Sequence, residues 1–438
     1  MSRVVPWKAF VSKMSDYFNT FVLTRGLFIS LLASAFIYLD YWGLSHPFIN
    51  TLLGLTALYL LLQADKKVWF IAGAGIGLLW FWWIVLSLWH YGMIWAVPIE
   101  LIIIMLTYGL MFWVIAWISE KISSKIPIPT VYMKALGLLG LSYLHPFSFD
   151  WLKPELIFVE SYLGIKKWQF ALILLGITLS IHTQRFYYLL LLFFAYEPRV
   201  YTTTPLEQNI ALVTTHTTVS EKWDESMQTA HFKILIEAID AAIEAKKSLV
   251  VLPESVFPVF LNHSQELIDA LQARAKQISI VTGGLYWDGK TPRNSAYIFT
   301  GNTITVANKV VLVPFGESNP LPDFLSDWVN KVFYDGAVDY KASSQTTDYL
   351  VNGVRYRNAI CFEATSEILY SKDANGNRPQ NMIVLSNNGW FTPSTEPTLQ
   401  KLLLQYYSKK YGTTIYHAVN MSESYVVKEG LVFKTTKN

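Results

Sequence analysis

The stretch Ser248-Leu-Val-Val-Leu-Pro-Glu254 decides the fold of the second half of this chain. Its apolar run has the length of one buried strand. The Pro-Glu pair ends that strand and places a charged side chain directly after it. Amphipathic helical patterns flank it at Thr229 to Ala245 and at Gln265 to Gln277. Short buried strands that alternate with helices of this length are typical of an α/β domain. We therefore predict an α/β domain over residues 206–438.

Predicted strands and helices continue to alternate on both sides of this stretch. The predicted strands are Asn209 to Thr214, Ser248 to Pro253, Ile278 to Tyr286, Asn294 to Thr300, Thr303 to Val313, Val354 to Phe362 and Met382 to Ser386. Two more helices are predicted, at Thr365 to Lys372 and at Pro397 to Tyr411. The strands and helices together predict a layered α/β structure.

The first 200 residues are almost continuously apolar. Over the whole chain 52% of residues are hydrophobic and only 15% are charged, well below the roughly 25% charged residues of an ordinary soluble protein. We predict a helical membrane domain of about seven spans over residues 1–200. The spans are placed at Thr24 to Leu44, Asn50 to Gln63, Val68 to Trp89, Met93 to Ser119, Pro129 to Pro146, Trp168 to His182 and Phe186 to Ala195.

Basic residues in the joints predict the orientation of these spans, because positively charged loops stay in the cytoplasm. With a cytoplasmic start, nine basic residues lie inside: Arg3, Lys8, Lys13, Arg25, Lys66, Lys67, Lys121, Lys125 and Arg185. Three lie outside: Lys153, Lys166 and Lys167. An odd number of spans then places the α/β domain on the outer side of the membrane.

A carboxylate, an ammonium and a thiol stand at three comparable strand ends of the α/β domain. They belong to Glu254, to Lys309 and to Cys361, the chain's one cysteine. A thiol attacks only as the thiolate, so it needs a base and a nearby positive charge, and these residues supply both. Each residue taken singly has an ordinary structural interpretation, but their joint occurrence favours a catalytic site. A lone cysteine and scattered histidines imply no metal.

Several blocks of this sequence resemble the nitrilase, or carbon–nitrogen hydrolase, superfamily. The blocks are Leu-Pro-Glu254, Lys309 followed by Leu-Val-Pro-Phe-Gly-Glu317, Ile-Cys361-Phe-Glu363 and Ser-Asn-Asn-Gly-Trp390-Phe. The preceding spans narrow the resemblance to the apolipoprotein N-acyltransferases of bacterial membranes. This resemblance implies an α-β-β-α sandwich after the membrane bundle, with Glu254 as general base, Lys309 as oxyanion stabiliser and Cys361 as nucleophile. Glu317 and Glu363 are implied as supporting carboxylates.

The resemblance also implies a reaction and a location. A phospholipid would donate an acyl group to Cys361 as a thioester, and the N-terminal amine of a lipoprotein would accept it, without a cofactor. The enzyme would be a multi-pass protein of the bacterial inner membrane with its catalytic domain in the periplasm. Substrate contacts are expected from Trp223, Trp328, Phe362 and Trp390.

Two alternatives remain at this point. After Trp390 the chain has Leu-Gln-Lys401 where the family usually has a Gln-His pair, and Phe362 stands where a tyrosine is usual. A conjugal-transfer relative of similar layout and a membrane-tethered amidase are therefore also considered. Nucleic-acid binding is unsupported, because a net charge of +3 comes without a basic run or stripe.

An aromatic stretch from Leu321 to Ser344 separates Glu317 from Cys361. Its apolar residues, Trp328 among them, recur at roughly helical spacing. One interpretation is a mobile arm that rests on the outer leaflet and admits lipid. The other is a short helix packed on the domain's own core.

Overall fold

The computed structural model describes residues 19–144, 149–198, 209–314, 316–318, 339–373 and 375–435. These residues form two compact units. The helical unit holds the described residues up to Leu144, residues 152–198 and Pro393–Leu402. The α/β unit holds residues 149–151, the described residues from 209 to Thr392, and residues 403–435.

The helical unit contains a helical segment at each of the seven predicted positions. The main helices are α2 (Thr20–Tyr41), α3 (Pro47–Gln63), α4 (Lys66–Phe81), α6 (Val97–Ser123), α7 (Thr130–Leu141) and α8 (Lys167–Thr183). Shorter pieces are η1 (Trp82–Val85), α5 (Leu86–His90), η2 (Ile94–Ala96), η4 (Pro154–Phe158) and η5 (Phe186–Ala195). The fifth predicted span was too long, since α7 ends at Leu141.

Three stretches of this unit are long and apolar enough to cross a membrane: Thr20–Tyr41, Lys66–His90 and Ile94–Ser123. Large apolar side chains point outward from the unit, among them Ile102 on α6, which is 55% exposed. Inside, α4 and α6 approach closely at Gly73, where a Cβ atom would lie 2.6 Å from the Tyr108 carbonyl oxygen. Small residues at helix contacts and apolar residues outside are the pattern of a helical membrane domain.

The α/β unit is built from two six-stranded sheets. The first has the order β1-β2-β4-β5-β6, with β3 paired to β4, and the second has the order β12-β11-β10-β9-β8-β7. Their bounds are β1 (Ile210–Leu212), β2 (Leu249–Val251), β3 (Phe257–Phe260), β4 (Ser279–Trp287), β5 (Pro292–Thr300), β6 (Thr303–Asn308), β7 (Asp348–Val351), β8 (Val354–Ile360), β9 (Asn381–Asn387), β10 (Thr414–Asn420), β11 (Tyr425–Lys428) and β12 (Leu431–Lys434). Strands β1, β2 and β4 run parallel, as do β8, β9 and β10.

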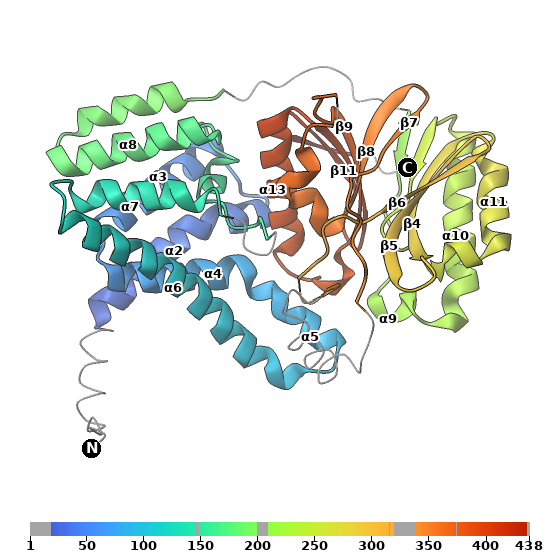
Figure 1. Ribbon diagram of the computed structural model, residues 1–438, viewed down its shortest axis with the longest axis horizontal. Coiled ribbons are helices and arrows are strands. Elements are labelled where there is room, and N and C mark those ends of the chain that lie inside the picture. Colours follow the sequence, from blue (N-terminus) through green and yellow to red (C-terminus); the bar gives the residue numbers. More distant parts are fainter. Residues whose placement is uncertain are drawn as a thin grey trace. The chain divides into compact units, whose positions relative to one another are not determined.

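The two sheets pack face to face and helices cover their outer faces (Figure 1). The inner core combines Val251 and Val281 of the first sheet with Ile360 and Leu385 of the second. Helices α10 (Glu225–Glu244) and α11 (Gln265–Ala275) cover the first sheet, with Leu235 in a second core cluster. The part of helix α13 (Glu396–Tyr411) that belongs to this unit, residues 403–411, lies along the second sheet (Figure 1). This arrangement confirms the predicted α-β-β-α sandwich.

Two local predictions were wrong next to the catalytic candidates. The helix predicted at Thr365 to Lys372 is instead a pair of 3-10 turns, η7 (Cys361–Thr365) and η8 (Glu367–Tyr370). The strand predicted to reach Val313 ends at Asn308. Its continuation has no neighbouring strand, because the backbone N–H groups of Val310 and Val311 donate to the Glu363 carboxylate instead.

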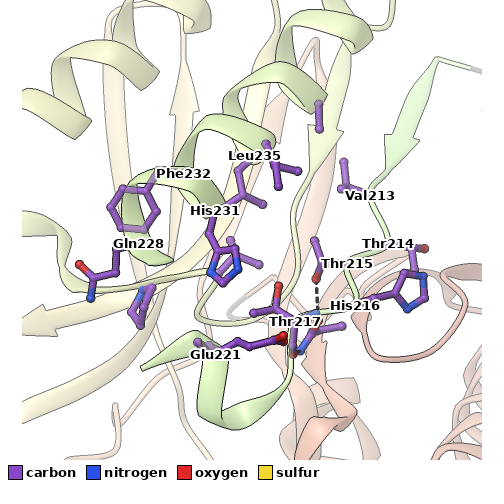
Figure 2. Close-up of a pocket in the computed structure, with 16 residues that line it drawn as sticks. Val213, Thr214, Thr215, His216, Thr217, Glu221, Gln228, His231, Phe232 and Leu235 are labelled. Carbon is purple, nitrogen blue, oxygen red and sulfur yellow. Dashed lines mark hydrogen bonds between the residues drawn. The ribbon is translucent and has the colours of Figure 1, made fainter. Parts of the chain in front are cut away.

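A cavity of about 410 Å³ opens beside the start of α10. It is enclosed by the segment after β1, by α9 (Val219–Lys222) and by α10 (Figure 2). His216, Lys222 and His231 line it together with apolar side chains such as Phe232 and Leu235. The cavity therefore combines basic and apolar walls within the α/β unit.

Candidate active site

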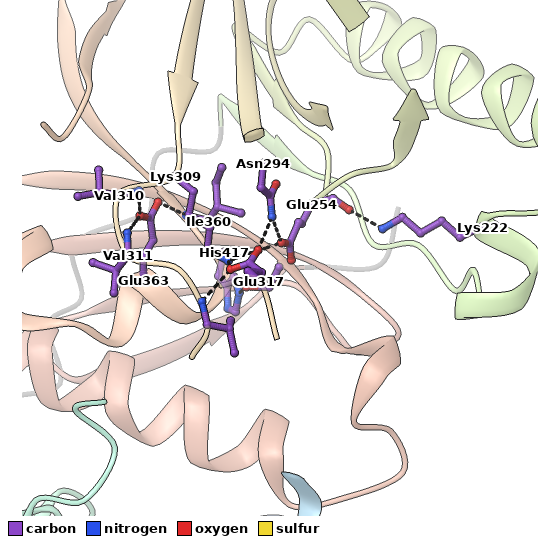
Figure 3. Close-up of polar contacts among 12 residues, drawn as sticks. Lys222, Glu254, Asn294, Lys309, Val310, Val311, Glu317, Ile360, Glu363 and His417 are labelled. Atoms are coloured by element: carbon purple, nitrogen blue, oxygen red, sulfur yellow. Dashed lines mark hydrogen bonds and ion pairs between the residues drawn. The ribbon is translucent and has the colours of Figure 1, made fainter. Parts of the chain in front are cut away.

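The three catalytic candidates follow the ends of strands in both sheets. Glu254 comes three residues after β2, Lys309 directly follows β6, and Cys361 directly follows β8. Figure 3 shows Glu254 and Lys309 converging on one polar cluster. The sandwich thus brings strand ends from two sheets to a common edge, where α/β folds commonly place their sites.

The backbone is strained at two of these strand ends. Cys361 has a φ of 51° and Ser255, next to Glu254, has a φ of 46°. Both lie in the left-handed region that residues other than glycine rarely adopt, and such strain gathers at functional sites. Gly283 of β4 permits the turn after Glu254, since a Cβ atom there would lie 2.2 Å from the Ser255 nitrogen.

Lys309 is the centre of a buried charge network (Figure 3). Its ammonium nitrogen lies 2.7 Å from Oε2 of Glu317 and 4.0 Å from Oε1 of Glu254. The Asn294 amide donates to both carboxylates, at 2.8 Å to Glu254 and 2.9 Å to Glu317. The backbone N–H of Val313 also donates to Glu317 at 2.9 Å. These bonds fix the Glu254 carboxylate and the Lys309 ammonium relative to each other.

Neighbouring negative charges keep the Lys309 side chain protonated. Burial alone would lower the pKa of this lysine, but the charges of Glu317, Glu254 and Cys361 outweigh burial and raise the pKa above its ordinary value. Only 1% of the Lys309 surface is exposed. Lys309 is therefore a permanent cation in a water-poor site, where such a charge stabilises a nearby anion far better than in bulk solvent.

Glu363 ties the segment after Lys309 to the strand that carries Cys361. Its carboxylate accepts from the backbone N–H groups of Val310 at 2.6 Å, Val311 at 3.1 Å and Ile360 at 2.8 Å. Burial raises the pKa of Glu363 to about 7, although Lys309 and these donors favour the charged form. The residue therefore holds two parts of the site together, and its bond to the Ile360 N–H also caps the short turn η7.

The Cys361 thiol is partly buried at the turn after β8. Its side chain packs against the core between the sheets, and its charge is among those that raise the pKa of Lys309. The Cys361 thiol therefore lies within electrostatic range of the Lys309 ammonium.

Comparison with known proteins identifies the family of this chain. Residues 20–198 match the family model described as the apolipoprotein N-acyltransferase integral membrane domain. An apolipoprotein N-acyltransferase of Wolinella succinogenes is 39% identical over 406 residues, which cover 92% of this chain and 94% of the relative. The enzyme of that name in Helicobacter pylori is 31% identical, over 94% of this chain and 96% of the relative. The chain belongs to the apolipoprotein N-acyltransferase family.

The conjugal-transfer and amidase alternatives are not favoured. Both relatives match this chain over nearly their whole length, and both are named apolipoprotein N-acyltransferase. Among solved structures, a CN-hydrolase superfamily protein from Xanthomonas campestris matches 52% of the chain and 87% of its own length. That match has 15% identity and a TM-score of 0.39. An amidase from Nesterenkonia matches 51% of the chain and 86% of its own length, with 16% identity and a TM-score of 0.39.

Three of the four aromatic residues predicted to contact substrate lie within the described part of the chain. Trp223 follows α9 and is 47% exposed. Phe362 is buried and stacks on Trp151, with ring centroids 6.2 Å apart. Trp390 ends the short turn η9 (Asn388–Trp390) and is partly buried. Trp328 lies outside the described residues, as does most of the aromatic stretch.

Sequence reasoning missed two polar residues of this site. Asn294 bridges Glu254 and Glu317 from the start of β5, and Lys222 donates from its ammonium to the Glu254 backbone carbonyl at 3.1 Å. Asn294 occupied a predicted strand, where an asparagine is unfavourable, and that mismatch was an available signal.

Proposed function

We propose that this protein transfers a fatty acyl group from a phospholipid to the N-terminal amine of a lipoprotein through a thioester on Cys361. The observation that carries the proposal is the Lys309 ammonium, buried within 4.0 Å of the Glu254 carboxylate and interacting with the charge of Cys361. Family membership supports the choice of substrates, since the relatives are named for this acyl transfer to apolipoproteins.

In the first half of the reaction, Glu254 takes the proton of the Cys361 thiol, and the sulfur attacks the carbonyl carbon of the phospholipid ester. The carbonyl oxygen becomes an oxyanion that faces the Lys309 ammonium. The carbon–oxygen ester bond then breaks, and the departing glycerol oxygen takes the proton from Glu254. The products are a lysophospholipid and an acyl thioester on Cys361.

In the second half, the lipoprotein amine attacks the thioester carbonyl carbon. Glu254 removes a proton from the attacking nitrogen, Lys309 again faces the oxyanion, and the carbon–sulfur bond breaks as the amide forms. The proton on Glu254 returns to the departing sulfur. Glu254 thus serves as base and acid in both halves, and Lys309 keeps its charge throughout.

Aromatic residues near these strand ends are proposed to contact the substrates. Trp223 offers an exposed ring at the end of α9, and Phe362 lies beside the nucleophile in its stack with Trp151. Trp390 follows β9 in the same sheet as Cys361. The proposed contacts of Trp328 with lipid stay a prediction from the sequence.

We place the catalytic domain, residues 206–438, on the periplasmic side of the inner membrane. The nine-to-three asymmetry of basic residues over seven spans supports this orientation. A reporter enzyme that is active only outside the cytoplasm, fused after Asn438, should be active. Activity only of a cytoplasmic reporter at that position would reject both the orientation and the access to lipoproteins.

Mass spectrometry of the purified protein tests the proposal. After incubation with phospholipid, the protein should gain the mass of one acyl chain on Cys361. Hydroxylamine, which cleaves thioesters, should remove this added mass. The Cys361→Ala variant controls for acyl groups elsewhere. An unmodified Cys361 together with lysophospholipid release, or an adduct that persists in Cys361→Ala, rejects the thioester.

A further inference from the structure

Lys222 is the one residue of α9 that turns into the site. The short helix begins at a capping box, in which the Thr218 hydroxyl accepts from the Glu221 backbone N–H and Glu221 accepts from Thr218. Only 6% of Lys222 is exposed, whereas the next residue, Trp223, is 47% exposed. The Lys222 ammonium donates to the Glu254 carbonyl oxygen at 3.1 Å (Figure 3).

This hydrogen bond acts on the backbone of the proposed general base. The Glu254 carbonyl belongs to the strained turn in which Ser255 has a φ of 46° and β4 passes closely at Gly283. Asn294 holds the Glu254 carboxylate at 2.8 Å, so the side chain and the main chain of this residue are fixed by different donors. Such double fixation keeps a catalytic group in its productive geometry.

The charge environment of Lys222 differs from that of Lys309. Burial lowers the pKa of Lys222 to about 8, and the charges of Glu254 and Cys361 only partly oppose this effect. Lys222 makes no described ion pair with a carboxylate, whereas Lys309 contacts two. The other titratable groups on the cavity that Lys222 lines are Glu221 of its own helix, His216 of the segment after β1, and His231 of α10.

We propose that Lys222 is a positioning residue of this site, whose buried ammonium fixes the Glu254 peptide and adds a second positive charge beside the Cys361 thiol. The inference rests on the proposed function for its catalytic meaning. Lys309 remains charged at all working pH values, while Lys222 loses its proton above about pH 8. Above that pH the site keeps only the Lys309 charge to stabilise the negative charge that develops in the reaction, so acyl loading should decline there.

Alkylation of Cys361 tests this directly, because the chain has one cysteine and its rate with iodoacetamide follows the thiolate fraction. Lys222→Met removes the charge at similar length, and the pH midpoint of alkylation should rise by about one pH unit, which is roughly a tenfold slower rate at pH 7. Lys222→Arg should keep the midpoint. Lys233→Met, on the exposed face of α10, is the matched control and should change nothing.

An unchanged midpoint in Lys222→Met, or an equal rise in Lys222→Arg, overturns the proposal, because a merely structural lysine would act without its charge. Thermal unfolding shows whether Lys222→Met is folded. If it is not, the acyl-loading profile decides: the alkaline decline near pH 8 should disappear in Lys222→Arg and persist in a His216→Gln/His231→Gln variant. A decline that stays in Lys222→Arg overturns the proposal.

The experiments can reject the positioning role of Lys222 and the proposed acyl transfer independently of each other. Alkylation uses no lipid, so a midpoint that depends on Lys222 without any acyl adduct on Cys361 would remove the proposed function and leave the positioning role. An acyl adduct with no dependence on Lys222 would do the reverse.

Discussion

The helical unit and the α/β unit depart in different ways from the usual distribution of side chains in a water-soluble protein. The helical unit turns large apolar residues outward, with Ile102 55% exposed on α6. The α/β unit places charged residues inside, with Lys222, Glu254, Lys309 and Glu363 all buried. Both arrangements cost free energy in a water-soluble protein. Exposed apolar side chains are favourable in a lipid environment. Buried charges are favourable in a site where the reaction develops charge. The distribution of side chains in each unit therefore indicates what that unit does.

Removal of the nucleophile should have the largest effect. Cys361→Ala should lower acyl transfer by at least about 10³-fold, because no other thiol exists in the chain. The thermal midpoint should hardly change, since the side chain is small and only partly buried. Substantial remaining transfer in this variant would mean that the buried charges of the α/β unit serve another purpose.

Removal of the buried cation should damage both stability and activity. Lys309→Met leaves Glu254 and Glu317 buried without their common ammonium, which typically costs about 3–5 kcal/mol in the free energy of unfolding. Denaturant unfolding of the purified variant measures this loss. Lys233→Met, which removes a lysine from an exposed ion pair on α10, should cost less than about 1 kcal/mol. Equal losses in both variants would show that the buried network is not special.

A charge on the outward face of the helical unit should have a smaller effect, and one that depends on lipid. Ile102→Arg on α6 should disfavour membrane insertion by about 2.5–3.5 kcal/mol. Ile304→Arg on β6, where the side chain is 40% exposed, should change stability by no more than about 0.5 kcal/mol. The fraction of protein extracted from membranes by alkaline carbonate measures the first effect. If Ile102→Arg is retained like the wild type, the outward face of α6 does not contact lipid.

The sequence predicted those parts of the structure that follow from the periodicity of apolar residues and from composition. Apolar runs located the helices of the first unit, and alternation of strands and helices located the sandwich. The strand ends at Glu254 and Cys361 were recognisable because the apolar run stops at a reactive side chain, whereas Lys309 lay inside the predicted strand Thr303 to Val313. These signals are local, so they can be read without knowledge of which strands are neighbours.

Contacts between distant segments were not predictable in this way. Glu363 was expected to be a supporting carboxylate, but the sequence did not indicate that it accepts from backbone N–H groups 52 and 53 residues away. Lys222 and Asn294 reach Glu254 only because α9 and β5 fold onto the same sheet edge. Strands as short as β11 and β12 carry too few residues for a period to be recognised.

The central claim is that one thioester passes its acyl group to an amine. A single-turnover chase tests it most directly: the protein acylated on Cys361 is freed of phospholipid and mixed with a synthetic lipopeptide that carries a free N-terminal amine. The account predicts that the acyl mass leaves Cys361 at the rate at which N-acylated lipopeptide appears. Loss of the acyl group to water alone, or N-acylated lipopeptide that forms while Cys361 keeps its adduct, would contradict the account.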